Sequence, residues 1–317
     1  MSTKSMVFAV TIVTALPAVG SAQNLPPDWM FPGPGAGGPA NKPEDPTLRR
    51  MPGSKAAFTD AALHDLSRAV DWHPDEHPPM PPPVAIGQNG ANACGFCHLP
   101  GGEGRPENAA LAGLPAGYIR RQLAAFASGA RQGMQPHWGP TAYMIETAKS
   151  AKPEAVAAAA DYFSRLRFTS RVRVVEGDVA PQAVQSGFVY RTLPAQSAPL
   201  GERIVETPTS FERFEMREPH MTYIAYVPAG SVARGAALAL KGGSAGPPCA
   251  TCHGVGLRGD LGPPLAGRSP TYLVRQLMAF QHGSRTDIEA ARMRQVTAKL
   301  TVRDMVDLAA YAATLKP

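Results

Sequence analysis

The chain contains CGFCH at residues 94–98 and CATCH at residues 249–253. Each stretch is one copy of the pattern Cys-x-x-Cys-His, and together they hold all four cysteines of the 317 residues. Four cysteines would suit a disulfide framework in a small secreted protein. Here they form two close pairs, separated by about 150 residues, and a histidine follows each pair. The spacing therefore favours a bound group over disulfides.

The Cys-x-x-Cys-His pattern is typical of covalent haem attachment. Two thiols add to the two vinyl groups of one porphyrin, and the adjacent histidine supplies a nitrogen ligand to the iron. A thioredoxin-like redox pair would lie beside a βαβ pattern, which neither motif has. A zinc site would have to join pairs that lie far apart in the chain. We predict two haem c groups, held by Cys94, Cys97 and His98 and by Cys249, Cys252 and His253.

The sequence that follows each motif is also repeated. YIRRQLAAFASGAR at residues 118–131 matches YLVRQLMAFQHGSR at residues 272–285 at eight of fourteen positions, and Leu-Ala-Gly precedes both. Self-similarity of this kind indicates one domain used twice. Tyr118 and Tyr272 begin the repeated segment, and we expect them to line the haem edge, although packing in the core explains them equally well.

The iron needs a sixth ligand, for which methionine and histidine are the usual candidates. Met144 and Met293 occupy matching places late in the two copies, each eighteen residues before a tyrosine. A methionine on a helix is more often core filler than ligand, but the matched positions favour ligation. We predict Met144 and Met293 as ligands. The alternatives are Met134, His137 and His282.

One outer contact also follows from the sequence. The carbonyl of Pro263 is placed to accept a hydrogen bond from the ring of His253, which would fix the tautomer of that ligand. Ala109 matches Pro263 in the first copy. We assign no such contact to Ala109.

The pattern of apolar, β-branched and proline residues divides the chain into segments of different kinds. Helical spacing is found on both sides of a stretch with short β-branched and aromatic runs. We therefore predict a mainly α fold with two helical haem domains joined by a long, partly extended connector. A Thr cap and apolar spacing predict a short helix over residues 59–70, and the prolines that follow predict no regular structure before Val84. The segments are a signal peptide (1–22), a Pro/Gly-rich N-terminal arm with the short helix (23–83), a first helical domain (84–168), the connector (169–228) and a second helical domain (229–317).

The N-terminus and the charge indicate where the protein works. Lys4, an apolar stretch and Gly20-Ser21-Ala22 form a secretory signal, with cleavage expected after Ala22. The apolar stretch is too short to span a bilayer, so we expect a periplasmic protein without stable membrane insertion. The net charge is +6, which four haem propionates would largely offset. No basic run supports nucleic-acid binding.

These residues resemble the c4-type di-haem cytochromes. The resemblance covers about residues 84–168 and 229–317, and it rests on the Cys-x-x-Cys-His motifs, the Leu-Ala-Gly turns, the repeated helix, the late methionine and the closing tyrosine. It implies two class I cytochrome c domains, each with one covalent haem and His/Met ligation. The long connector, the N-terminal arm and the stretch DWHPDEHPPMPPP at residues 71–83 depart from that pattern.

The resemblance implies an electron carrier without substrate chemistry of its own. Its partners would be redox proteins such as a periplasmic dehydrogenase or a terminal oxidase. One alternative is a haem-bearing subunit of a dehydrogenase complex. Another is an enzyme, either a di-haem peroxidase or a thiosulfate-oxidising cytochrome, in which one iron would keep an open position.

Overall fold

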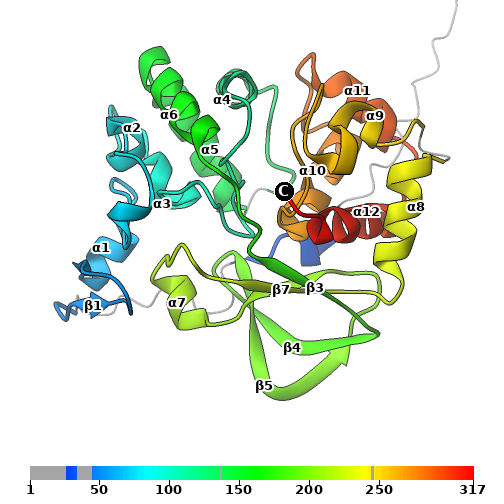
Figure 1. Ribbon diagram of the computed structural model, residues 1–317, viewed down its shortest axis with the longest axis horizontal. Helices are drawn as coiled ribbons and strands as arrows, with labels where there is room; N and C mark the ends of the chain where they lie inside the picture. Colours follow the sequence, from blue (N-terminus) through cyan, green and yellow to red (C-terminus); the bar gives the residue numbers. More distant parts are fainter. Residues whose placement is uncertain (1–25, 34–44, 136–137, 244–245) are drawn as a thin grey trace, which may run out of the picture.

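Two groups of helices lie side by side above a layer of strands (Figure 1). The computed structural model describes residues 26–33, 45–135, 138–243 and 246–317. The predicted signal peptide and the first residues of the arm lie outside this part of the chain. The fold is mostly helical with strands in the middle, as expected from the sequence.

The first helical group contains the first Cys-x-x-Cys-His motif. Its helix α4 ends at Gly129, whose φ of 78° is a conformation that glycine adopts at little cost. Helices α5 and α6 have proline in their first turn, where a missing N–H is harmless. The group consists of α2 (Pro82–Ala85), α3 (Cys94–His98), α4 (Ala116–Ser128), α5 (Gly139–Ser150) and α6 (Pro153–Arg165).

The second helical group repeats this order around the second motif. Its last helix begins with a capping box in which Thr301 and Asp304 satisfy each other's backbone N–H groups. The group consists of α8 (Ser231–Lys241), α9 (Ala250–His253), the 3₁₀ turn η3 (Val255–Leu257), α10 (Pro270–His282), α11 (Ala290–Thr297) and α12 (Val302–Thr314).

Helices α8 and α12 touch at Gly235. A Cβ at this position would come within 1.9 Å of the carbonyl oxygen of Asp307. Arg234, beside it, donates to both carboxylate oxygens of Asp307 at 2.7 and 2.9 Å. The absence of a side chain therefore sets how closely the two helices approach.

The connector contains more regular structure than its sequence texture predicts. Strands β4 and β5 form an antiparallel hairpin, and β3, β7 and β6 form a second sheet in which β3 runs parallel to β7. A short helix, α7 (Phe211–Glu215), lies between β6 and β7. The strands are β3 (Val172–Glu176), β4 (Val179–Ser186), β5 (Val189–Pro199), β6 (Val205–Pro208) and β7 (Tyr223–Val227).

The N-terminal arm differs from expectation in two places. The helix predicted over residues 59–70 begins at its Thr59 cap but ends at His64, because Asp65 turns its side chain back onto the N–H of Ser67 at 2.9 Å. The prolines before Val84 do not exclude helical turns, since proline fits the first turn. The elements are η1 (Asp28–Met30), β1 (Arg49–Arg50), β2 (Ala57–Phe58), α1 (Asp60–His64) and η2 (Pro74–Glu76), with α2 beginning at Pro82.

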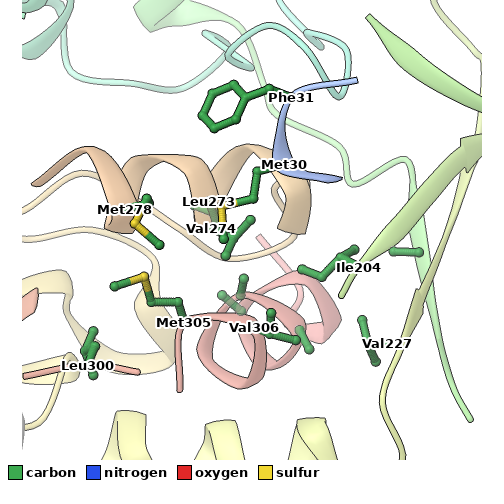
Figure 2. Close-up of a cluster of buried hydrophobic side chains, with 14 of the residues drawn as sticks. Met30, Phe31, Ile204, Val227, Leu273, Val274, Met278, Leu300, Met305 and Val306 are labelled. Atoms are coloured by element: carbon green, nitrogen blue, oxygen red, sulfur yellow. The ribbon is translucent and has the colours of Figure 1, made fainter. Parts of the chain in front are cut away.

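The largest apolar core belongs to the second helical group. Figure 2 shows Met278 of α10 beside Met305 of α12, with Val227 of β7 and Ile204, which directly precedes β6, in the same cluster. Met30, from the N-terminal arm, is fully buried in the same cluster. The arm and the connector thus complete a core that the helices alone would leave open. Among the described residues, no helix combines the length and the apolar character that a membrane crossing requires.

Candidate haem-binding site

One cavity of about 700 Å³ runs between the two helical groups, and both Cys-x-x-Cys-His motifs line it. This volume is within the range of small-molecule and cofactor sites. All ten residues predicted for the site contribute to its wall. They are Cys94, Cys97, His98, Tyr118 and Met144 from the first copy, and Cys249, Cys252, His253, Tyr272 and Met293 from the second.

The two motif histidines are held in the same way. His98 ends α3, and its Nδ1 is 2.8 Å from the carbonyl oxygen of Ala109; His253 ends α9, with its Nδ1 2.8 Å from that of Pro263. Because a carbonyl only accepts, each Nδ1 carries the proton and each Nε2 keeps its lone pair. Burial lowers the pKa of both imidazoles, which favours the neutral form that binds a metal.

The contact of Pro263 confirms the expectation from the sequence, whereas that of Ala109 was missed. The Leu-Ala-Gly turns align Ala109 with Pro263, so the alignment contained the necessary signal. The acceptor is a backbone carbonyl, which every residue has, and the side chain at this position is therefore uninformative.

The four thiols line the cavity, two from each helical group. Burial raises the pKa of Cys94 to about 12, and it also raises the pKa of Cys97 and of Cys249. The free thiols of these three residues are therefore protonated at neutral pH.

The cavity lining excludes only some of the candidates for the sixth ligand. Met144 lies on α5, and Met293 lies on α11, and both are half-buried in the cavity wall. Met134 lines the same cavity and also packs against the large core. His282 lies outside this lining, with its Nδ1 3.1 Å from Ser284 Oγ. His137 falls outside the described residues.

The end of each repeated segment supplies a buried arginine to the cavity. Arg131 donates to the side-chain oxygens of Gln122 and Gln276 at 2.6 and 2.8 Å. Arg285 donates to the same two oxygens at 2.7 and 3.2 Å. All four residues occupy identical places in the two copies, so the repeat makes a reciprocal contact across the cavity.

The same arginines stack on the phenylalanines of their own segments. The guanidinium carbon of Arg131 lies 4.4 Å from the ring centre of Phe126, and that of Arg285 lies 4.0 Å from the ring centre of Phe280. Both phenylalanines line the cavity. The stacking holds the two charges in fixed positions.

The electrostatics of this cluster call for an anion. Within the described chain neither Arg131 nor Arg285 forms a salt bridge, and burial together with the charge of Arg131 lowers the pKa of Arg285. Arg285 Nε is buried without a hydrogen-bond partner among those residues. Two buried like charges are unfavourable unless they are paired. Two haem groups fit the site. The propionates would neutralise Arg131 and Arg285, the vinyl groups of each haem would react with one cysteine pair, and one histidine Nε2 would bind each iron.

Comparison with known proteins agrees with this geometry. The cytochrome c family model matches residues 232–316, which span α8 to α12. The chain is 37% identical over 65 residues to cytochrome c-554(548) of Halomonas halodenitrificans and covers 78% of it. It is 37% identical over 87 residues to cytochrome c4 of Pseudomonas aeruginosa and covers 43% of that protein. It is 29% identical over 217 residues to a thiosulfate dehydrogenase electron acceptor of Thiomonas intermedia, of which it covers 73%.

The chain is also similar to parts of two solved structures. One is a thiosulfate dehydrogenase (TsdBA) of Marichromatium purpuratum, at 27% identity and a TM-score of 0.48; the match spans 72% of this chain and 37% of that one. Another is cytochrome c4 of Acidithiobacillus ferrooxidans, at 23% identity and a TM-score of 0.45, over 70% of this chain and 98% of that one. With the family match and the site geometry together, the chain belongs to the cytochrome c family of haem-binding electron-transfer proteins, and its homologues include the di-haem c4 type.

Proposed function

We propose that this protein is an exported di-haem carrier that moves electrons between periplasmic redox proteins. Residues 84–168 and 229–317 would each form one haem domain, and residues 169–228 would join them. The observation that carries the proposal is the shared cavity, because its wall includes both motifs and a late methionine from each copy.

The residues divide the work of holding the cofactors. Each cysteine pair would form the thioether bonds, and each histidine, oriented by a backbone carbonyl, would bind iron. Met144 and Met293 would supply the sixth ligands. Arg131 and Arg285 would receive propionate groups. Bound haem supplies one-electron chemistry at iron, and the protein sets the potential through ligation, burial and nearby charge.

The ligand set favours a carrier over an enzyme. An iron with methionine at the sixth position has no vacant site for peroxide or for a sulfur substrate. Both proposed haem sites open into one cavity between the helical groups. This arrangement favours electron exchange between the two irons rather than two independent reactions.

A more specific version concerns the partner. The similarity to a thiosulfate dehydrogenase electron acceptor extends over most of that protein. We infer that this chain accepts electrons from a separate dehydrogenase, with thiosulfate dehydrogenase as the first candidate. Such encounters need only a small, transient interface.

The function is tested on the holoprotein exported to a periplasm. Mass spectrometry should give the chain without residues 1–22 plus two haems. Optical and EPR spectra should show two low-spin irons with methionine ligation, and turnover with hydrogen peroxide should be negligible. Met293→Ala, which would open one iron, is the matched control for peroxide access. Enzyme-like peroxidase or thiosulfate oxidation by the wild-type protein would overturn the proposal.

The partner is tested separately. A thiosulfate dehydrogenase without its own acceptor should reduce this protein in stopped-flow mixing when thiosulfate is present. Reduction by small reductants but not by that enzyme would leave the carrier intact and remove this partner. A complex that survives purification would instead favour a fixed subunit.

A further inference from the structure

A second cluster of ligating side chains lies away from the haem cavity, where the N-terminal arm meets the connector. His73 precedes η2, Glu76 ends it, and His220 follows α7. One nitrogen or oxygen atom from each of the three lies within 4.8 Å of the other two. His73 and Glu76 belong to the 71–83 stretch, which the c4-type pattern leaves without a role.

The three side chains approach one another closely, and His220 and Glu76 are hydrogen-bonded. His220 Nε2 is 2.6 Å from Glu76 Oε2, and His73 Nδ1 is 3.8 Å from Glu76 Oε1. The two imidazole rings lie with their centres 4.5 Å apart and their planes tilted by 33°. One nitrogen of each ring therefore faces the same carboxylate.

The opposite nitrogens of the two rings face a second carboxylate, Glu218. Its side chain is only 1% exposed, and its Oε1 lies 3.2 Å from His220 Nδ1 and 3.9 Å from His73 Nε2. Arg213 donates to the other oxygen at 2.7 Å. A carboxylate on the far nitrogen is the usual partner of a metal-binding histidine, because it fixes the tautomer and raises the basicity of the ligand.

The backbone around the cluster is fixed by other contacts. Trp72 Nε1 donates to the carbonyl of Met216 at 2.7 Å and so ties the arm to the connector one residue before His73. The N–H of His220 donates to Glu218 Oε1 at 2.8 Å. His73 Nε2, the nitrogen that faces Glu218, is buried and has no hydrogen-bond partner within the described chain. The backbone is thus fixed on both sides of the cluster, and the His73 nitrogen that faces Glu76 is Nδ1.

We propose that His73, Glu76 and His220 bind a divalent transition-metal ion, with Zn²⁺ as the expected occupant and water completing its coordination. Two imidazoles and one carboxylate suit zinc, whereas Mg²⁺ prefers an all-oxygen set. Glu218 is the positioning residue. The bound ion would clamp the arm to the connector beside the first helical group. The rival explanation is a network of protonated histidines and carboxylates without metal.

The test uses tag-free holoprotein from which metal has been removed with EDTA, titrated with Zn²⁺ in a calorimeter. We expect one Zn²⁺ per chain, confirmed by elemental analysis against haem iron, and no response to Mg²⁺. His220→Ala and Glu76→Gln should each weaken binding by at least about 100-fold. Glu218→Gln should weaken it by about 10- to 100-fold, the range for outer-shell partners of a metal site.

Controls separate loss of ligand from loss of fold. His64→Ala removes an exposed histidine that lies near a carboxylate on the same arm, and it should bind Zn²⁺ as the wild type does. Haem spectra and circular dichroism should be unchanged in all variants. Wild-type protein that binds no Zn²⁺ would overturn the proposal, and so would a folded His220→Ala variant with full affinity. Either result leaves the haem-based function untouched.

Discussion

The two helical groups form similar parts of the cavity wall, but different elements pack on the outside of each group. Helices α4 and α10 have thirteen residues each and end at a left-handed glycine, and α6 and α12 also have thirteen residues. The first helix differs. Helix α8 has eleven residues and packs on α12, whereas its counterpart α2 has only four.

In the first group, the short α2 and the connector pack where the second group has the longer α8. Val84 of the short α2 is fully buried, and its carbonyl would lie 2.8 Å from a Cβ at Gly95. The guanidinium carbon of Arg217, from the connector, lies 3.5 Å from the ring centre of Phe96, between the two cysteines of the motif. The motif and the repeated helix are thus the constant parts, while a helix or a connector can close the outside.

The largest effect expected is loss of one haem from one group. Changing Cys249 and Cys252 to Ala should leave one haem per chain, and changing Cys94 and Cys97 to Ala should do the same, because each group supplies its own attachment residues. Intact mass and the haem absorbance per chain measure this. If either variant lost both haems, the two groups would not be independent.

The next effect concerns the sixth ligands. Met293→Ala should remove the methionine-to-iron charge-transfer band of the second haem and lower its potential by on the order of 0.1 V, within the roughly 0.8 V range that axial ligands set. Met144→Ala should do so for the first haem. Spectra and redox titrations of Met134→Ala decide the alternative, since a lost band there and not in Met144→Ala would exchange the two assignments.

The packing of α8 on α12 should be intolerant of any side chain at Gly235. Gly235→Ala places a methyl group against a backbone oxygen and should destabilise the protein by about 3 kcal/mol, the upper part of the usual range for overpacking. Urea unfolding followed by circular dichroism measures it. In Gly117→Ala the nearest atom is the flexible end of Arg121 at 3.1 Å, and the change should stay below about 1 kcal/mol. Equal losses would show that the close approach is not the cause.

The sequence predicted what depends on neighbouring residues or on the repeat. The motifs, the matched helices, the late methionines and the strand-forming runs are all local patterns, and strands β3 to β7 lie in the segment predicted to be partly extended. Strands β1 and β2 lie in the N-terminal arm, where no strand was predicted. The contact of Pro263 was predictable because the loop is short. The length of the helix after Thr59 was not, because the side chain of Asp65 competes for the backbone there.

The sequence did not predict contacts between residues that lie far apart in the chain. Strands β3 and β7 pair in parallel although the hairpin, β6 and α7 lie between them in the chain. Arg217 reaches Phe96 from the connector, and His220 reaches Glu76 across 144 residues. No local periodicity encodes such pairings. The reciprocal arginine cluster was different, because Gln122, Gln276, Arg131 and Arg285 were visible as identical positions of the repeat.

The packing of the connector on the first helical group should depend on Arg217. Its Nε donates to the carbonyl of Leu63 at 3.0 Å and its Nη1 donates to that of Phe96 at 3.1 Å. Arg217→Ala should cost about 2 kcal/mol, as hydrogen bonds from a charged group do, and should expose the first haem site to limited proteolysis before the second. Arg203→Ala, which removes a half-buried arginine with one carbonyl contact, is the control. Faster cleavage at the second group would reverse the comparison.

The smallest effect is a difference in pH dependence between the two repeated helices. Glu206 of β6 accepts from Ser269 Oγ at 2.7 Å and from the N–H of Thr271 at 3.1 Å, at the start of α10, whereas α4 begins after Pro115 without a side-chain cap. Burial raises the pKa of Glu206 above the usual glutamate value of 4.5, although those hydrogen bonds oppose the shift.

The direction in which stability changes with pH follows from the raised pKa of Glu206. The folded protein holds the proton of Glu206 more tightly than the unfolded chain does, so its contribution to stability is fully present below pH 4.5 and is lost as the pH rises through the folded pKa. The wild type should therefore lose stability relative to Glu206→Gln, whose side chain does not titrate, as the pH rises above 4.5. Hydrogen exchange of the α10 amides at several pH values should show this change, and the α4 amides should not. Glu202→Gln, an exposed carboxylate that pairs with Arg303, controls for general charge effects. If the two proteins kept a constant difference over this pH range, Glu206 would not be the group that titrates, and the caps of α10 and α4 would respond to pH alike.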